Sequence, residues 1–186
     1  MPFPLNMPNT ITAIRFVLTP VFVLFLIEGE FPYAFLVFIG AAVTDGLDGL
    51  IARLLKQKTT LGSYLDPIAD KLMLSSAYIA LAAIEVIPVW LAVVVISRDV
   101  LITMGALVVT IFEGTFMMHP SIISKITTVS QISTVILVLM AQFMSISPTL
   151  PRVLFWLTTV FTTVSGLHYI YFGLRILNDG GGATRQ

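Results

Sequence analysis

The sequence predicts an all-α membrane protein with six transmembrane helices, and three observations lead to that class. First, hydrophobic residues fill 57% of the 186 positions and charged residues only 11%, whereas about a quarter of a soluble domain is charged. Second, the mean hydropathy is +0.98. Third, the chain contains repeated apolar runs of about the 20 residues that cross a bilayer. Helices are expected because hydrocarbon offers no partner for an unpaired backbone N–H or C=O.

Turn residues divide the chain into these helices in order. The first run ends before residues 28–30 (EGE), and the second ends in the basic segment around Lys56. The later breaks contain Pro88, Pro120 and Pro148, and proline disfavours a continuing helix. The predicted helices cover residues 11–27, 31–54, 64–84, 89–112, 124–144 and 152–177. No linker or repeat interrupts them, so one domain covering residues 1–186 is expected.

Charged residues predict the side of the membrane that each loop occupies. The segment between the second and third helices carries Arg53, Lys56 and Lys58, and basic residues favour the cytoplasmic side. Loops on the opposite side carry acidic residues such as Glu28 and Glu85. Both chain termini are therefore expected in the cytoplasm. The N-terminal segment lacks a basic region and a small-residue cleavage site, so we expect it to be retained.

Four of the ten acidic residues lie within one apolar stretch. Asp45 and Asp48 are three positions apart on the second predicted helix, and Asp66 and Asp70 are four apart on the third. Both spacings place a pair on one helical face, and antiparallel helices would let the two pairs face each other. Converging carboxylates repel unless a cation lies between them, and oxygen ligands suit Mg²⁺, Mn²⁺ or Ca²⁺. The spacing therefore favours a divalent-metal site.

A solvated loop is the alternative interpretation of these aspartates, with the acids paired to the basic residues nearby. Small residues favour a binding site instead. Gly46, Gly49 and Gly62 lower helix stability relative to alanine, and Gly49 and Ala52 share the face of the aspartates. This face can admit a bulky ligand close to the backbone.

Residues 45–70 carry the pattern DxxDGxxARx₈GxxxDxxxD. The pattern resembles the signature of the CDP-alcohol phosphatidyltransferases at all eight fixed positions. The resemblance implies a six-helix membrane enzyme with its active site at the cytoplasmic edge of the bundle. Such an enzyme transfers a phosphatidyl group from CDP-diacylglycerol to an alcohol and releases CMP. The resemblance also implies two divalent cations, Mg²⁺ or Mn²⁺, with Ca²⁺ as another occupant.

The resemblance assigns roles to individual residues. It implies that Asp45, Asp48, Asp66 and Asp70 are the metal ligands, and that Asp70 is also the general base for the acceptor hydroxyl. It implies that the donor nucleotide is bound by Asn9, Thr12, Gly49, Ala52, Arg53, Thr59 and Gly62. A helix N-cap is the alternative role for Asn9.

Three basic residues are predicted to bind the acceptor. The opening around Arg15 is similar to that of the glycerol-type branch of the family. Arg98 lies inside the fourth predicted helix and Lys125 at the start of the fifth, where both could bind the acceptor's phosphate. The alternatives are an Arg98–Asp99 pair that bridges helices, and a lysine that serves only as a topology anchor.

Two subfamilies of the glycerol-type branch compete. The segments ISRDV, IISKITTVSQI and FTTVSGLHYIYFG resemble more closely the CMP-forming cardiolipin synthases, whose acceptor is phosphatidylglycerol. Phosphatidylglycerophosphate synthases, which use glycerol 3-phosphate, typically carry Arg-Glu where this chain has Arg98-Asp99. We expect phosphatidylglycerol and keep glycerol 3-phosphate as the alternative. A cation transporter is a remote alternative, because the aspartates lie at one membrane edge and no repeat is visible.

Partners and location follow from the resemblance and the composition. Family members are commonly homodimers, so a homodimer is expected. The net charge is zero, which gives no overall attraction for nucleic acid. The chain has no cysteine and therefore no disulfide or thiol chemistry. A bacterial inner membrane is the expected location, with the active site facing the cytoplasm.

Overall fold

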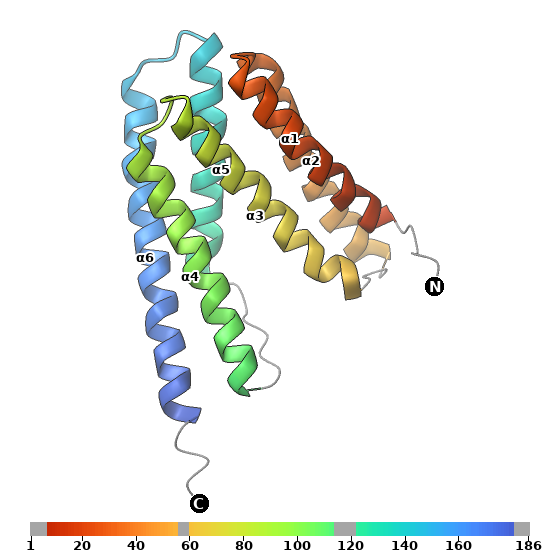
Figure 1. Ribbon diagram of the computed structural model, residues 1–186, viewed down its shortest axis with the longest axis vertical. Coiled ribbons are helices and arrows are strands. Elements are labelled where there is room, and N and C mark those ends of the chain that lie inside the picture. Colours follow the sequence, from red (N-terminus) through yellow and green to blue (C-terminus); the bar gives the residue numbers. More distant parts are fainter. Residues whose placement is uncertain (1–6, 56–59, 114–121, 181–186) are drawn as a thin grey trace, which may run out of the picture. The chain divides into compact units, whose positions relative to one another are not determined.

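The structure, a computed structural model, describes the backbone of residues 7–55, 60–113 and 122–180 and the side chains of residues 14–44, 71–105 and 122–173. The described part is all-helical (Figure 1). Its helices are α1 (Met7–Ile27), α2 (Phe31–Leu55), α3 (Thr60–Ala83), α4 (Val89–Glu113), α5 (Ile122–Phe143) and α6 (Thr149–Gly180). The predicted all-α class and its six helices are confirmed.

The helix boundaries differ from the predicted ones mainly at the helix starts. Helix α1 begins at Met7, α3 at Thr60 and α6 at Thr149, each a few residues earlier than predicted. These first turns are polar or contain proline, so a hydropathy pattern does not detect them. Proline fits the first helical turn because the N–H that it lacks has no partner there.

Two helices, α1 and α3, end in the same type of turn. The turn after α1 contains Gly29 with φ of 77°, and the turn after α3 contains Glu85 with φ of 60°. In each turn the next backbone N–H donates to a carbonyl five residues earlier, to Phe25 O or Leu81 O, at 2.9 Å. This bonding satisfies carbonyls at the helix end that have no partner inside the helix. Glycine adopts the left-handed conformation easily, whereas Glu85 adopts it despite its Cβ.

The chain divides into two compact units. Unit 1 comprises Met1–Pro88 and Val135–Ser147, and unit 2 comprises Val89–Thr134 and Pro148–Gln186. Helix α5 thus contributes its first part to unit 2 and its last part to unit 1. A single functional domain over residues 1–186 stays a prediction.

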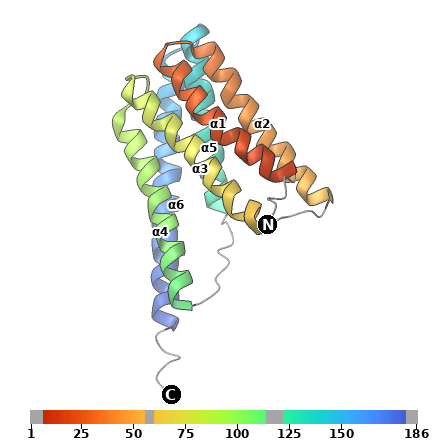
Figure 2. The same ribbon diagram turned by 45° about the vertical axis from the view of Figure 1, so that its right-hand side comes forward.

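Helix α1 is central to unit 1, because it packs against both α2 and α3. Phe22 of α1 and Phe38 of α2 are buried, with ring centroids 5.5 Å apart. The fully buried Ala34 and Ala77 let neighbouring helices approach closely. The end of α2 and the start of α3 lie at the same end of the unit (Figures 1 and 2). Helices α2 and α3 run in opposite directions, as predicted.

Unit 2 is built on α4, which packs along α6 (Figures 1 and 2). The ring centroids of Trp90 on α4 and Trp156 on α6 lie 5.4 Å apart near the starts of these helices. The first part of α5 is joined to α6 by hydrogen bonds between side chains and by one bond from Thr127 Oγ1 to the backbone carbonyl of Phe161. We call these residues the polar seam: Thr127, Ser130, Gln131 and Thr134 of α5 with Thr158 and Thr162 of α6.

Large apolar side chains cover much of the surface. Leu36, Val129 and Trp156 are each more than 60% exposed, which is unusual for a protein surrounded by water. Within the described residues, Ile122–Phe143 and Thr149–Gly173 are long and apolar enough to cross a membrane, and only 33% and 22% of their most apolar windows are buried. These features suggest membrane association.

Candidate functional site

The aspartate motif lies on two helices of unit 1. Asp45 and Asp48 fall in the last part of α2, and Asp66 and Asp70 fall in the first half of α3. Because each pair is on one continuous helix, the three- and four-residue spacings place each pair on one helical face. The helix ends that carry the motif lie at the same end of unit 1 (Figure 1). The side chains at residues 45–70 lie outside the described ones, so metal coordination stays a prediction.

The chemistry of the motif fits the predicted metal. Four carboxylates supply hard oxygen ligands, the type that Mg²⁺ and Mn²⁺ prefer. Elsewhere, the side chains that the structure describes contain no group of three or more acidic, histidine or cysteine residues able to hold a metal ion. The aspartate motif supplies ligands of the suitable type by its composition, and its role as a metal site stays a prediction.

The predicted donor-binding residues occur at the same end of unit 1. Asn9 and Thr12 lie in the first turns of α1, whose start is beside the end of α2 (Figures 1 and 2). The remaining positions in helices are Gly49, Ala52 and Arg53 of α2 and Gly62 of α3. Their side-chain positions lie outside the described residues, and Thr59 lies outside the described backbone too. Nucleotide binding by this set stays a prediction.

The three predicted acceptor residues are divided between the units. Arg15 is on α1 in unit 1, where its side chain is buried and its carbonyl accepts a hydrogen bond from Thr19 Oγ1 at 2.9 Å. Arg98 and Lys125 are on α4 and α5 in unit 2. Lys125 is exposed, whereas Arg98 is only 6% exposed. The roles of all three in acceptor binding stay predictions.

Arg98 forms an ion pair with its neighbour Asp99. Its Nη1 donates to Asp99 Oδ1 at 2.7 Å, and both side chains are buried. Consecutive residues on a helix point in different directions, so the pair forms only because the arginine side chain is long enough to bend toward the carboxylate. Burial without a partner would be costly for either charge, and the pair offsets part of that cost.

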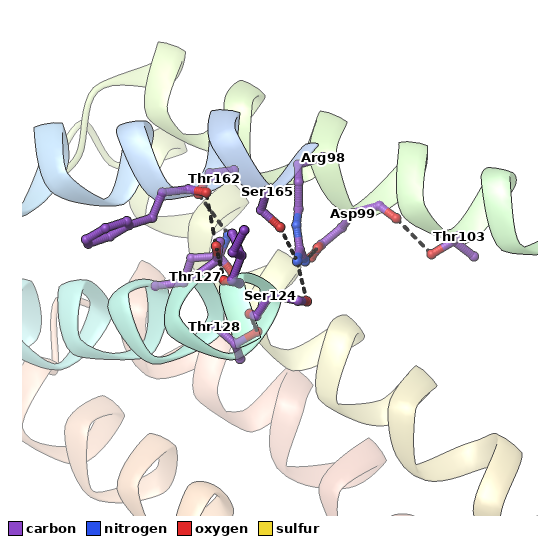
Figure 3. A network of polar contacts seen from close by, with 11 residues as sticks. Arg98, Asp99, Thr103, Ser124, Thr127, Thr128, Thr162 and Ser165 are labelled. Carbon is purple, nitrogen blue, oxygen red and sulfur yellow. Dashed lines mark hydrogen bonds and ion pairs between the residues drawn. The ribbon is translucent and has the colours of Figure 1, made fainter. Parts of the chain in front are cut away.

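Two serines hold the other side of the Arg98 guanidinium (Figure 3). Nη2 donates to Ser124 Oγ of α5 at 2.6 Å and to Ser165 Oγ of α6 at 3.0 Å. Arg98 therefore ties α4 to both other helices of unit 2. Its Nε is buried and has no hydrogen-bond partner among the residues that the structure describes.

Roles for Ser124, Ser165 and the polar seam were not predicted from the sequence. A signal was available in each helix: Thr127, Ser130 and Thr134 recur at three- and four-residue spacing, as do Thr158, Thr162 and Ser165 of α6. Such spacing marks one face of a helix. The spacing does not stand out in the sequence, because serine and threonine occur throughout these apolar helices, where many bond to their own backbone. Thr103 Oγ1, for example, donates to Asp99 O at 2.8 Å, a bond within its own helix.

The Arg98 cluster has the chemistry of an anion site. A guanidinium offers five N–H donors and suits phosphate oxygens. Three donors have partners here, in Asp99, Ser124 and Ser165. The cluster is thus both a tie between helices, as the alternative interpretation held, and an oriented donor group with unused capacity.

Comparison with known proteins finds matches over most of the chain. A family model described as CDP-alcohol phosphatidyltransferase matches residues 5–164. The Rattus norvegicus protein named cardiolipin synthase (CMP-forming) is 34% identical to this chain, over 92% of the chain and 63% of its own length. The Bacillus subtilis protein named CDP-diacylglycerol–glycerol-3-phosphate 3-phosphatidyltransferase is also 34% identical, over 88% of this chain and 93% of its own length. The chain thus spans less than two thirds of the rat relative.

Proposed function

The chain belongs to the CDP-alcohol phosphatidyltransferase family of enzymes, and on that premise we propose that it transfers a phosphatidyl group from CDP-diacylglycerol to a glycerol-type alcohol in phospholipid synthesis. The observation that carries this proposal is the aspartate motif of residues 45–70, complete in every fixed position and lying inside the matched region. The proposed enzyme spans the membrane six times. The motif faces the cytoplasm, in a bacterial inner membrane.

The reaction is a displacement at phosphorus. The acceptor hydroxyl loses its proton to Asp70 as its oxygen attacks the phosphatidyl phosphorus. The bond from that phosphorus to the bridging oxygen of CDP breaks, and CMP leaves with the bonding electrons. Positioning and charge neutralisation supply most of the catalysis in such transfers.

The proposed residue roles divide between binding and proton transfer. Asp45, Asp48, Asp66 and Asp70 would hold two divalent cations, which neutralise phosphate charge when bound. Arg53 binds the diphosphate, because a guanidinium pairs with two phosphate oxygens at once. Gly49, Ala52 and Gly62 leave space for the nucleotide, and Asn9, Thr12 and Thr59 contact it.

Phosphatidylglycerol is the proposed acceptor, which makes the product cardiolipin. The segments around Arg98, Lys125 and the later part of α6 support this choice, as does the rat relative named cardiolipin synthase. Arg98 binds the phosphate of the acceptor, with Arg15 and Lys125 as further contacts. A homodimer is the proposed assembly.

Glycerol 3-phosphate is the second candidate acceptor. It is favoured by the Bacillus subtilis relative, which this chain matches over 93% of that protein's length and whose name specifies glycerol 3-phosphate. The acidic residue after Arg98 does not decide between the two acceptors by its charge, because Asp and Glu carry the same charge.

The test measures CMP release by the purified protein in lipid vesicles that contain CDP-diacylglycerol. Phosphatidylglycerol and glycerol 3-phosphate are offered separately, with Mg²⁺, with Mn²⁺ and with a chelator. We expect metal-dependent release with phosphatidylglycerol exceeding that with glycerol 3-phosphate. The reverse order would assign glycerol 3-phosphate as the acceptor, and no release with any alcohol would overturn the proposed reaction.

A further inference from the structure

The guanidinium of Arg98 is held at three points by residues from three helices. Nη1 donates a hydrogen bond to Asp99 Oδ1 of α4 at 2.7 Å. Nη2 donates to Ser124 Oγ of α5 at 2.6 Å and to Ser165 Oγ of α6 at 3.0 Å. The close view shows these partners around the end of the arginine side chain (Figure 3). Three fixed contacts remove the freedom that a long arginine side chain otherwise has.

The Nε–H of Arg98 is the donor that these contacts leave unbonded. Nε is buried and has no hydrogen-bond partner among the described residues, and an unbonded N–H on a buried charged group is costly. Arg98 as a whole is only 6% exposed. Every guanidinium carries this N–H, and in Arg98 it is left without a partner in the described part of the chain while both terminal nitrogens are bonded. An anionic ligand that accepts from Nε would satisfy it.

We infer that Ser124 and Ser165 are positioning residues, which fix the plane of the Arg98 guanidinium so that its Nε–H is directed at the phosphate of the acceptor. The inference rests on the proposed function, in which Arg98 binds that phosphate. Asp99 fixes the opposite side and supplies the counter-charge, so the serines decide the orientation rather than the charge. Each serine acts through Arg98 and not by touching substrate.

The surroundings of Arg98 provide a matched control. Gly166 follows Ser165 on α6, and a Cβ at Gly166 would lie 3.7 Å from Arg98 Cγ, which is an ordinary contact distance. Gly166→Ala therefore changes the packing beside the arginine stem while it leaves both serine hydroxyls in place. We expect it to keep the kinetic constants of the unaltered protein.

The experiment compares Ser124→Ala, Ser165→Ala, the double variant, Arg98→Ala and Gly166→Ala in vesicles. The KM values for acceptor and for CDP-diacylglycerol and the kcat are measured for each variant. We expect the acceptor KM to rise about threefold in each single serine variant and about tenfold in the double variant. The donor KM and the kcat at saturating acceptor should change less than twofold. Ser165→Thr, which keeps a hydroxyl, should recover most of the loss.

The outcomes separate the two claims. If Arg98→Ala raises the acceptor KM but the double serine variant does not, the positioning role is wrong and the acceptor role of Arg98 stands. If Arg98→Ala leaves the acceptor KM unchanged, the proposed acceptor site is wrong and the inference fails with it. A purely structural role would lower thermal stability without this selective change in KM. If the double variant does not fold, the single variants decide, because each removes one of the two bonds to Nη2.

Discussion

The two charged regions of the chain are balanced in different ways. The Arg98 cluster of unit 2 contains its own counter-ion, Asp99, and two hydroxyl partners, all within hydrogen-bond distance. The aspartate motif of unit 1 has four carboxylates and a single guanidinium, Arg53, at its fixed positions. The first region is electrically complete, so it can hold a fixed shape by itself. The second region carries excess negative charge at these positions, which is the basis for predicting a cation from outside the chain.

Function is expected to follow this difference. An incomplete set of carboxylates suits a metal ion and its phosphate ligands, which supply the missing charge. A complete cluster suits recognition, since its donors are already oriented before the ligand arrives. Removing a charge should therefore abolish chemistry in unit 1 and should alter stability or binding in unit 2.

The largest expected effect is at Asp70 in the motif. Asp70→Asn keeps the size of the side chain but removes the base, so we expect turnover to fall by about 10²–10⁴-fold, with the helical content unchanged. CMP release and circular dichroism in the same vesicles measure the two quantities. Glu85→Gln, which changes an acidic residue outside the motif, serves as the control and should retain activity. A turnover in Asp70→Asn equal to that of the unaltered protein would exclude Asp70 from catalysis.

Much of the fold could be predicted because the relevant signals are local. Apolar runs and their breaks located all six helices, and the three- and four-residue spacings placed Asp45 with Asp48 and Asp66 with Asp70. Polar helix starts such as that of α3 were missed, because the hydropathy of a first turn resembles that of a loop. The exposed apolar side chains agree with the composition: two described helices are long and apolar enough to cross a membrane.

The Arg98 cluster shows what could not be predicted. Ser124 and Ser165 are 26 and 67 positions away from Arg98, and no spacing within one helix relates residues so far apart. The sequence suggested a pair between Arg98 and Asp99 as an alternative, and that pair is confirmed. Which hydroxyls complete it depends on how α4, α5 and α6 pack.

The second prediction concerns Asp99, the counter-charge of Arg98 in unit 2. Asp99→Ala leaves the buried Arg98 without its anion, and we expect the free energy of unfolding to fall by about 3 kcal/mol. Asp99→Asn retains an oxygen that can accept from Nη1, so its loss should be about half as large. Thermal unfolding in detergent compares the two variants. Equal losses would mean that the charge, and not the hydrogen bond, is what Arg98 requires.

The smallest expected effect concerns the polar seam, whose hydrogen bonds join neutral side chains. A change there tests how much uncharged hydrogen bonds between helices stabilise unit 2. Thr158 is fully buried, and its hydroxyl lies 2.7 Å from those of both Ser130 and Thr134. Thr158→Val keeps the volume and removes these bonds between α5 and α6.

We expect Thr158→Val to lower the free energy of unfolding by about 1 kcal/mol, because hydrogen bonds between membrane helices are individually weak. The matched control is Thr159→Val, since Thr159 Oγ1 donates to Phe155 O of its own helix at 2.7 Å. Thermal unfolding of the two variants isolates the contribution between helices. If both variants lose the same amount, the seam adds nothing beyond local backbone bonding, and unit 2 depends on the charged contacts of Arg98 and on apolar packing.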